Sequence, residues 1–241
     1  MNSPSLDAKR AKEFYSVVYK LYYCALRIEV RVQVAVHFLT TRVTKSTEED
    51  WQKLMRVLRF LNCTERSKLL LKPDNDPLQV EWFIDVGHAI HTDMRSQTGS
   101  VGKLNGATIY VRTCKMKGPT KSATESEFVG VSDEAPAPLW VNEFLYSLGL
   151  RPGCAILRED NTACIMLHDN GRSTSSRTRH VKIREWWLKY HIDAREIKFV
   201  WLEGRQQIAD ALSKPVVGTL FVEHFNMIHG VVLVYRKVYP R

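Results

Sequence analysis

Three strand-like runs follow one another between residues 78 and 114, and this arrangement restricts the fold more than any other feature. In residues 78–84, apolar side chains occupy every second position, which is typical of a half-buried strand. The runs 98–104 and 108–114 are separated by Asn105-Gly106, a pair that favours a tight antiparallel hairpin. The chain therefore predicts three consecutive strands, of which the last two pair directly.

Helices and two more strands are expected after this hairpin. Residues 124–148 have helical spacing, but Pro136 and Pro138 predict a kink or two separate helices. The remaining expected elements are strands at 155–157 and 197–202, helices at 162–167, 179–191 and 206–213, and a polar loop at 170–177. Together they indicate a mixed sheet with helices on its faces, in an α/β or α+β domain.

The N-terminal part has a different pattern. Residues 8–43 predict a broken helix, and the second half also fits a strand because Val32, Val34 and Val36 alternate. Residues 47–61 predict an amphipathic helix that begins with a capping box between Ser46 and Glu49. We expect a domain boundary in the Pro- and Asp-rich segment 72–77.

The net charge of +9 indicates an anionic partner, most often nucleic acid. The excess lies at the two ends, since residues 1–75 carry +6, residues 76–230 are neutral and residues 231–241 carry +3. With 44% hydrophobic residues the chain is neither disordered nor fibrous. Five cysteines without a C-x-x-C pair favour a reduced, intracellular protein, and the uncharged stretch 32–41 is too short to cross a bilayer.

Four acidic residues stand near the ends or starts of the expected elements: Asp85, Glu127, Asp160 and Asp210. Carboxylates that converge at strand ends repel one another unless divalent cations neutralise them, and oxygen ligands select Mg²⁺ or Mn²⁺. Two such ions about 4 Å apart are suited to phosphodiester hydrolysis. Other interpretations remain open: Glu127 could close a capping box with Thr124, Asp85 could form a turn, and Asp210 could lie on a solvated helix face.

The four carboxylates lie within longer recognisable strings. These are WFIDVGHAIHTDMRSQTGS (82–100), KSATESEFVGVSD (121–133), REDNTACIMLHDNGRSTSSRTRHVKIR (158–184) and LEGRQQIADALSKP (202–215). In this order they resemble the end of the Pol polyprotein of copia-type LTR retrotransposons, which comprises the tail of reverse transcriptase and the ribonuclease H domain. The segments 19–30 and 47–64 resemble the region that precedes this domain, so the resemblance covers roughly residues 15–230.

This resemblance implies a fold, an activity and a domain division. The implied fold is a ribonuclease H-like α/β fold, with a mixed five-stranded sheet flanked by helices and an N-terminal helical extension. The implied reaction is two-metal endonucleolytic cleavage of the RNA strand in an RNA/DNA hybrid, with two Mg²⁺ or Mn²⁺ ions held by Asp85, Glu127, Asp160 and Asp210. The expected division is a reverse transcriptase remnant (1–76), a ribonuclease H-like domain (77–230) and an unmatched tail (231–241).

The same resemblance suggests where the substrate binds. Arg172, Arg177, Arg179, Lys182 and Arg184 form a run without acids that could contact phosphates, although a solvated helix face is the alternative. Asn161 could bind sugar or support the metal, and His180 occupies a family position where a proton shuttle is one option and helix capping the other. Trp186 and Trp187 are expected in the core rather than as base-stacking platforms.

The chain also departs from the family pattern. Gly87 stands where the family has a second aspartate, and no Tyr-x-Asp-Asp polymerase motif is present in this sequence. A longer polyprotein would supply the reverse transcriptase palm, in the cytoplasm or in a virus-like particle, and no membrane partner is expected. Two alternatives therefore stay open: a catalytically decayed copy that still binds nucleic acid, and a structural module whose carboxylates lie more than about 8 Å apart.

Overall fold

The computed structural model describes residues 3–64, 68–71, 77–165 and 179–230, with side chains in the last range from residue 183 onward. The expected loop at 170–177 and the tail 231–241 lie outside these ranges. The N-terminal elements are α1 (Ala8–Arg27), the 3₁₀ turn η1 (Val30–Val32), α2 (Gln33–Thr40) and α3 (Glu48–Cys63). The strands are β1 (Val80–Gly87), β2 (Gln97–Leu104), β3 (Ala107–Lys115), β4 (Ala155–Glu159) and β5 (Ile197–Trp201). The remaining elements are α4 (Ala123–Glu134), α5 (Pro136–Ser147), α7 (Arg179–Asp193), the 3₁₀ turn η2 (Gly204–Gln206), α8 (Asp210–Ser213) and α9 (Gly218–His229).

The five strands form one mixed sheet in the order β3-β2-β1-β4-β5. β1, β2 and β3 pair antiparallel, whereas β4 pairs parallel with both β1 and β5. The hairpin between β2 and β3 turns at Asn105 and Gly106, whose φ angles of 45° and 76° suit a two-residue turn of the type that Asn-Gly favours. The predicted hairpin and mixed sheet are thus confirmed.

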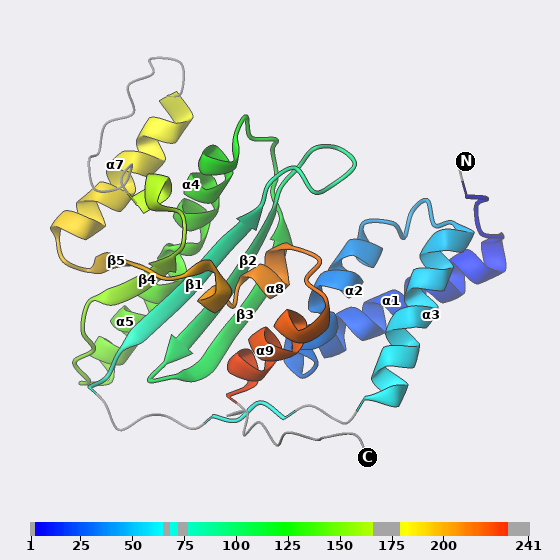
Figure 1. The fold of residues 1–241 in the computed structure, drawn as a ribbon, viewed down its shortest axis with the longest axis horizontal. Coiled ribbons are helices and arrows are strands. Elements are labelled where there is room, and N and C mark those ends of the chain that lie inside the picture. Colours follow the sequence, from blue (N-terminus) through cyan, green and yellow to red (C-terminus); the bar gives the residue numbers. More distant parts are fainter. Residues whose placement is uncertain (1–2, 65–67, 72–76, 166–178, 231–241) are drawn as a thin grey trace.

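Helices cover both faces of the sheet (Figure 1). On one face α4, α5 and α7 pack on a core built around Trp82, Ile84 and Leu157. On the other face α8 and α9 pack over Val101, with Ile208 and Leu212 buried between them and the sheet. The alternation of β1 therefore divides its side chains between two cores, as its sequence pattern predicts.

The N-terminal helices form a third core of their own and also contact the sheet. Phe14, Val18, Leu39 and Leu54 are buried among α1, α2 and α3. Gln33 of α2 donates a hydrogen bond to the Val111 carbonyl of β3, with Nε2 and O 3.3 Å apart. The ambiguous segment 32–38 is therefore helical, because its apolar residues pack both on α1 and against the sheet.

Three details of the expected helices are wrong. The α3 capping box is formed by Thr47 and Asp50, one residue later than expected. The expected helix 206–213 is reduced to four residues, Asp210–Ser213, after the turn η2. The helix α9 was not expected at all. The other helical expectation, a break at the prolines, is confirmed, since α5 begins at Pro136, where proline is favoured in the first helical turn.

Candidate active site

The four predicted carboxylates come from four elements that meet at one end of the parallel pair β1 and β4. Asp85 lies near the end of β1 with 1% of its surface exposed, and Asp160 directly follows β4. Glu127 projects from α4, which packs on β1, and Asp210 begins α8, which packs on β1 and β2. Because parallel neighbours end at the same edge, the sheet places Asp85 and Asp160 in one region.

Burial and the proximity of other carboxylates raise the pKa values of these groups. Burial, followed by the nearby carboxylates of Asp85 and Glu159, raises the pKa of Glu127 to about 10. Burial and the Asp85 carboxylate raise the pKa of Asp210 to about 7, and the same two causes raise the pKa of Asp160. The cluster therefore favours bound protons or bound cations over four free negative charges.

A lysine that the sequence analysis did not select lies between two of these carboxylates. The Lys214 ammonium donates one hydrogen bond to Asp85 Oδ1 and another to Asp210 Oδ1, each over 2.9 Å. The hydroxyl of Ser213 donates to the other oxygen of Asp85. Although burial alone would lower it, the pKa of Lys214 is raised by Asp85 and Asp210. Asp85 is therefore a fully partnered buried anion, and neither the turn nor the solvated-face interpretation fits Asp85 or Asp210.

Glu159 is a fifth carboxylate in this region, and sequence reasoning missed it. It is 1% exposed, its Oε1 accepts a hydrogen bond from the Asn161 amide over 3.1 Å, and its Oε2 is buried without a partner. Burial raises the pKa of Glu159 to about 8. The sequence signal was an acidic residue on a buried strand next to Asp160.

The helix α4 directs Glu127, and not Glu125, toward the cluster. Ser122 is the N-cap and accepts a hydrogen bond from the Glu125 amide, while the Glu125 carboxylate accepts one from the Lys121 amide. Glu127 is 7% exposed, and its Oε2 is buried without a partner. The capping-box interpretation of Glu127 is therefore wrong, since the box position belongs to Glu125.

The donor set fits a divalent cation in its chemistry. It consists of carboxylate oxygens, the ligands that Mg²⁺ and Mn²⁺ prefer, and includes the unpartnered Oε2 atoms of Glu127 and Glu159. No three Asp, Glu, His or Cys side chains in the described ranges are placed to hold one ion directly. Instead, Lys214 supplies the positive charge between Asp85 and Asp210.

The side chain of Gln207 connects β1 and β4 beyond the end of their hydrogen-bonded ladder. The ladder between β1 and β4 pairs residues 81–83 with 156–158. Beyond this point the fully buried Gln207 side chain donates to the carbonyls of Ile84 and Arg158, with Nε2–O distances of 2.9 and 3.3 Å. Gln207 thus bridges β1 and β4 where their shared ladder ends, three residues before α8 begins.

The predicted nucleic-acid contacts are only partly within the described structure. Arg172 and Arg177 lie outside the described residues, and so do the side chains of Arg179, His180 and Lys182, whose backbone belongs to α7. Arg184 is ion-paired with Asp133 of α4. Asn161 accepts a hydrogen bond from the Cys164 amide over 3.1 Å, so its side chain caps the short helical stretch 162–165.

The two tryptophans of α7 differ. Trp187 is partly buried against the α4–α5–α7 core, as expected. Trp186 is 72% exposed, so the expectation that it lies in the core is wrong. The reason is helical geometry, because adjacent residues on a helix point about 100° apart and only one of them can face the sheet.

The chain is similar in sequence to several known proteins, although no family model matches it. It is 28% identical over 211 residues to the retrovirus-related Pol polyprotein from transposon RE1 of Arabidopsis thaliana, which covers 87% of this chain and 14% of the relative. It is 27% identical over 92% of its length to the Pol polyprotein from transposon RE2 of the same plant. It is 25% identical over 84% of its length to that from transposon TNT 1-94 of Nicotiana tabacum. The chain spans about 15% of the length of these last two relatives.

Among solved structures, the chain is similar to LC11-RNase H1, isolated from compost by a metagenomic approach. The TM-score is 0.45 and the sequence identity 13%, over 56% of this chain and 92% of that chain. RNase H1 from Halobacterium salinarum NRC-1 matches with a TM-score of 0.40 and 15% identity, over 56% of this chain and 94% of that chain. None of the helices that the structure describes is both long and apolar enough to span a membrane.

The sequence similarity agrees with the resemblance noted from the sequence. The sheet order, with three antiparallel strands followed by two parallel ones, is the mixed five-stranded sheet that was expected. Over most of its length the chain is similar in sequence to retrovirus-related Pol polyproteins of transposons, and its fold is α/β with helices on both faces of this sheet.

Proposed function

We propose that this chain is the ribonuclease H part of a retrotransposon Pol polyprotein, and that it cleaves the RNA strand of an RNA/DNA hybrid in a reaction that depends on divalent metal ions. The observation that carries this proposal is the meeting of Asp85, Glu127, Asp160 and Asp210 at the end of β1 and β4. These carboxylates come from four separate elements, and their mutual repulsion favours the binding of further cations beside Lys214.

In this proposal the same four carboxylates hold two Mg²⁺ or Mn²⁺ ions. The bound metal would activate a water molecule and stabilise the charge that develops on the phosphodiester. The protein positions the ligands from rigid elements: Asp85 from a strand in the centre of the sheet and Glu127 from a helix packed on that strand. Burial and the neighbouring carboxylates raise the pKa of Glu127 and so favour its protonated form in the metal-free protein, and a protonated Glu127 must release its proton to bind a cation.

The substrate class is supported by sequence similarity and by charge. The relatives that cover most of the chain are Pol polyproteins. The basic run from Arg172 to Arg184 provides cations for phosphate contacts close in sequence to Asp160. We further propose the division into a reverse transcriptase remnant (1–76), a catalytic domain (77–230) and a tail (231–241), with the palm of a longer polyprotein as a partner.

A second candidate function is nucleic-acid binding without cleavage. The observation that favours it is the ion pair of Lys214 with Asp85 and Asp210, which neutralises two of the proposed ligands without a metal. Gly87 also favours this second candidate, because the family that the chain resembles has a second aspartate at this position.

The deciding experiment compares hybrid cleavage by the wild type and by Asp160→Asn with Mg²⁺ present. The matched control is Asp193→Asn, since Asp193 is exposed at the end of α7 and pairs only with the surface residue Lys189 among the described contacts. We expect Asp160→Asn to reduce cleavage at least a hundredfold and Asp193→Asn to change it less than twofold. Equal activity of the wild type and Asp160→Asn would refute the nuclease assignment, and hybrid binding without cleavage by the wild type would favour the second candidate.

A further inference from the structure

The C-terminal end of α8 holds a lysine against the proposed metal ligands. Asp210 and Lys214 are four residues apart, and the Lys214 amide donates to the Asp210 carbonyl over 2.9 Å. This backbone contact fixes the root of the side chain next to Asp210. The ammonium then also reaches Asp85, which belongs to the central strand of the sheet.

The Lys214 ammonium compensates the negative charge of the buried Asp85 carboxylate in the metal-free protein. Asp85 is 1% exposed, and a buried carboxylate without a positive partner is costly. The ammonium and the Ser213 hydroxyl together partner both oxygens of Asp85. Removal of the ammonium would leave Asp85 and Asp210 with their mutual repulsion and without a nearby positive charge.

We propose that Lys214 is an intramolecular counter-cation that occupies the divalent-metal site in the metal-free protein and that an incoming ion displaces. The proposal rests on the proposed function, because it assigns Asp85 and Asp210 as metal ligands. Lys214 would thereby be a positioning residue: it keeps the carboxylates preorganised before metal binding and lowers the affinity of the site for the metal.

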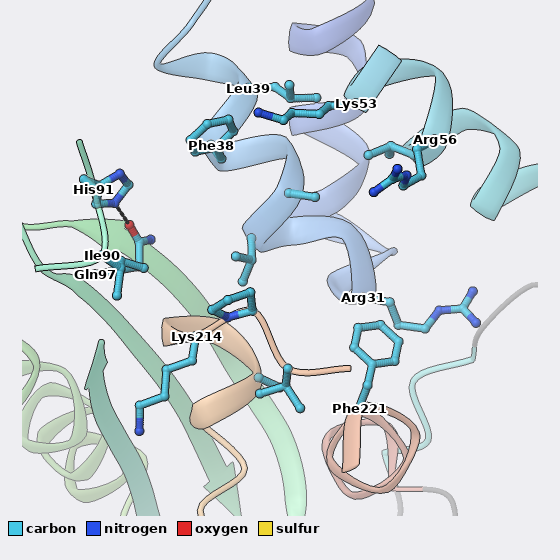
Figure 2. Close-up of a pocket in the computed structure, with 16 residues that line it drawn as sticks. Arg31, Phe38, Leu39, Lys53, Arg56, Ile90, His91, Gln97, Lys214 and Phe221 are labelled. Carbon is cyan, nitrogen blue, oxygen red and sulfur yellow. Dashed lines mark hydrogen bonds between the residues drawn. The ribbon is translucent and has the colours of Figure 1, made fainter. Parts of the chain in front are cut away.

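The surroundings of Lys214 allow its ammonium to leave. Its side chain is 41% exposed, whereas Asp85 and Asp210 are 1% and 17% exposed. Its stem lines a pocket of about 510 Å³ together with Ala211 and Pro215, and Figure 2 shows the ammonium pointing away from that pocket. The stem can therefore rotate into space that already exists, without breaking the packing of α8.

The pocket is bounded on its other side by the N-terminal helices. Phe38 and Leu39 of α2 and Arg56 of α3 face Lys214 and Phe221 across it (Figure 2). The pocket is also lined by the cationic side chains of Arg31, Lys53 and Arg56, which repel a freed ammonium, so it remains near the mouth of the pocket and close to the carboxylates. The displacement is consequently reversible when the metal leaves.

The first test measures Mg²⁺ binding by calorimetry for the wild type, Lys214→Met and Lys214→Gln, without any nucleic acid. The matched control is Lys189→Met, which removes a partly exposed lysine from another i, i+4 pair, far from the carboxylate cluster in sequence. We expect both Lys214 variants to unfold at lower temperature in EDTA and to bind Mg²⁺ at least fivefold more tightly than the wild type. Equal dissociation constants of the wild type and a folded Lys214 variant would overturn the proposal.

The second test needs no variant. Acetic anhydride modifies free lysines, and mass spectrometry can follow the rate at each site. We expect Mg²⁺ to increase the acetylation rate of Lys214 at least fivefold and to leave that of Lys189 unchanged. An unchanged rate at Lys214, under conditions where calorimetry shows that Mg²⁺ binds, would refute displacement.

The two proposals fail in different ways. If the wild type binds Mg²⁺ with displacement of Lys214 but cuts no hybrid, the nuclease function fails and the counter-cation role stands. If the wild type cuts hybrid but Lys214 neither affects Mg²⁺ affinity nor gains reactivity, the counter-cation role fails and the function stands.

Discussion

The carboxylate of Glu134 on α4 accepts a hydrogen bond from the Arg112 guanidinium of β3, with Oε1 2.7 Å from Nη1. Its second oxygen accepts a hydrogen bond from Ser100 of β2 over 2.8 Å, and Glu134 is 2% exposed. One buried anion thus joins α4 to two strands of the antiparallel part of the sheet. Since α4 also carries Glu127, this contact helps to hold a proposed metal ligand in place.

We expect Glu134→Gln to lower the free energy of unfolding by about 1–3 kcal/mol, because the buried carboxylate loses its charge-assisted hydrogen bonds to Ser100 and to the partly exposed Arg112. Urea unfolding at pH 7 would measure the change. The control is Asp133→Asn, since Asp133 pairs with Arg184 at the surface, and this variant should cost at most about 1 kcal/mol. A loss in Glu134→Gln no greater than in the control would show that the Glu134 carboxylate does not stabilise the fold through these bonds.

Gly87 leaves no space for a side chain. A Cβ atom added there would collide with the Ser213 carbonyl and would lie 3.2 Å from Ile90 Cγ2. The space that a side chain would need at Gly87 is therefore occupied by the backbone of α8. The lack of a side chain at Gly87 allows Ser213 and Lys214 to approach Asp85.

We expect Gly87→Ala to destabilise the protein by about 1–3 kcal/mol, as overpacking typically does. Thermal unfolding would measure this, with Gly118→Ala as the control, since no atom lies within 4 Å of a Cβ there. Gly118→Ala should stay within about 1 kcal/mol of the wild type. Similar stabilities of the two variants would mean that α8 moves freely away from β1.

Local sequence signals predicted those elements that local chemistry determines. Asn105-Gly106 defines its hairpin because both residues must adopt positive φ, and Pro136 separates α4 from α5 because proline suits only the first turn of a helix. The segment after Leu202 could not be predicted in this way. There the Gln207 side chain bonds to the carbonyls of β1 and β4, and these long-range bonds interrupt the helix that periodicity suggests.

In the candidate site, too, local sequence signals identify some residues, while others can be recognised only from long-range packing. All four predicted carboxylates are selected by their places in the expected elements, Asp85 and Asp160 near strand ends and Glu127 and Asp210 on helices, and the family strings then support them. Glu159 leaves only a weak signal, an acid on a buried strand, and Lys214 leaves none, since a lysine after a short helix is an ordinary surface residue in most sequences. What distinguishes them is burial and the charges around them, which depend on how β4 and α8 pack.

His37 connects the N-terminal helices to the sheet through its neutral form. Its Nε2 accepts a hydrogen bond from the Lys115 amide of β3 over 3.3 Å, so this nitrogen must be unprotonated. Burial, followed by the positive charges of nearby His91, Arg112 and Lys115, lowers the pKa of His37. Protonation would break the contact between α2 and β3 and add a charge to a basic region.

The direction of the pH effect follows from this lowered pKa. In the unfolded chain a histidine has a pKa of about 6.5. The folded protein binds that proton less readily, so the stability that neutral His37 provides is complete above about pH 6.5 and is lost as the pH falls from there toward the lower folded pKa. We therefore expect His37 itself to contribute a loss of stability between pH 7.5 and pH 5.5, against the opposite contribution of the raised carboxyl pKa values of the site, and faster hydrogen exchange at the Lys115 amide.

The matched variant is His37→Gln, whose amide oxygen can accept the same hydrogen bond but does not titrate. The free energy of unfolding of His37→Gln minus that of the wild type, measured in urea at the two pH values, should rise as the pH falls from 7.5 to 5.5. The lowered pKa of His229 and the raised carboxyl pKa values of the site act in both proteins and cancel in this difference. The same pH dependence in both proteins would show that His37 does not link α2 to the sheet through its neutral form.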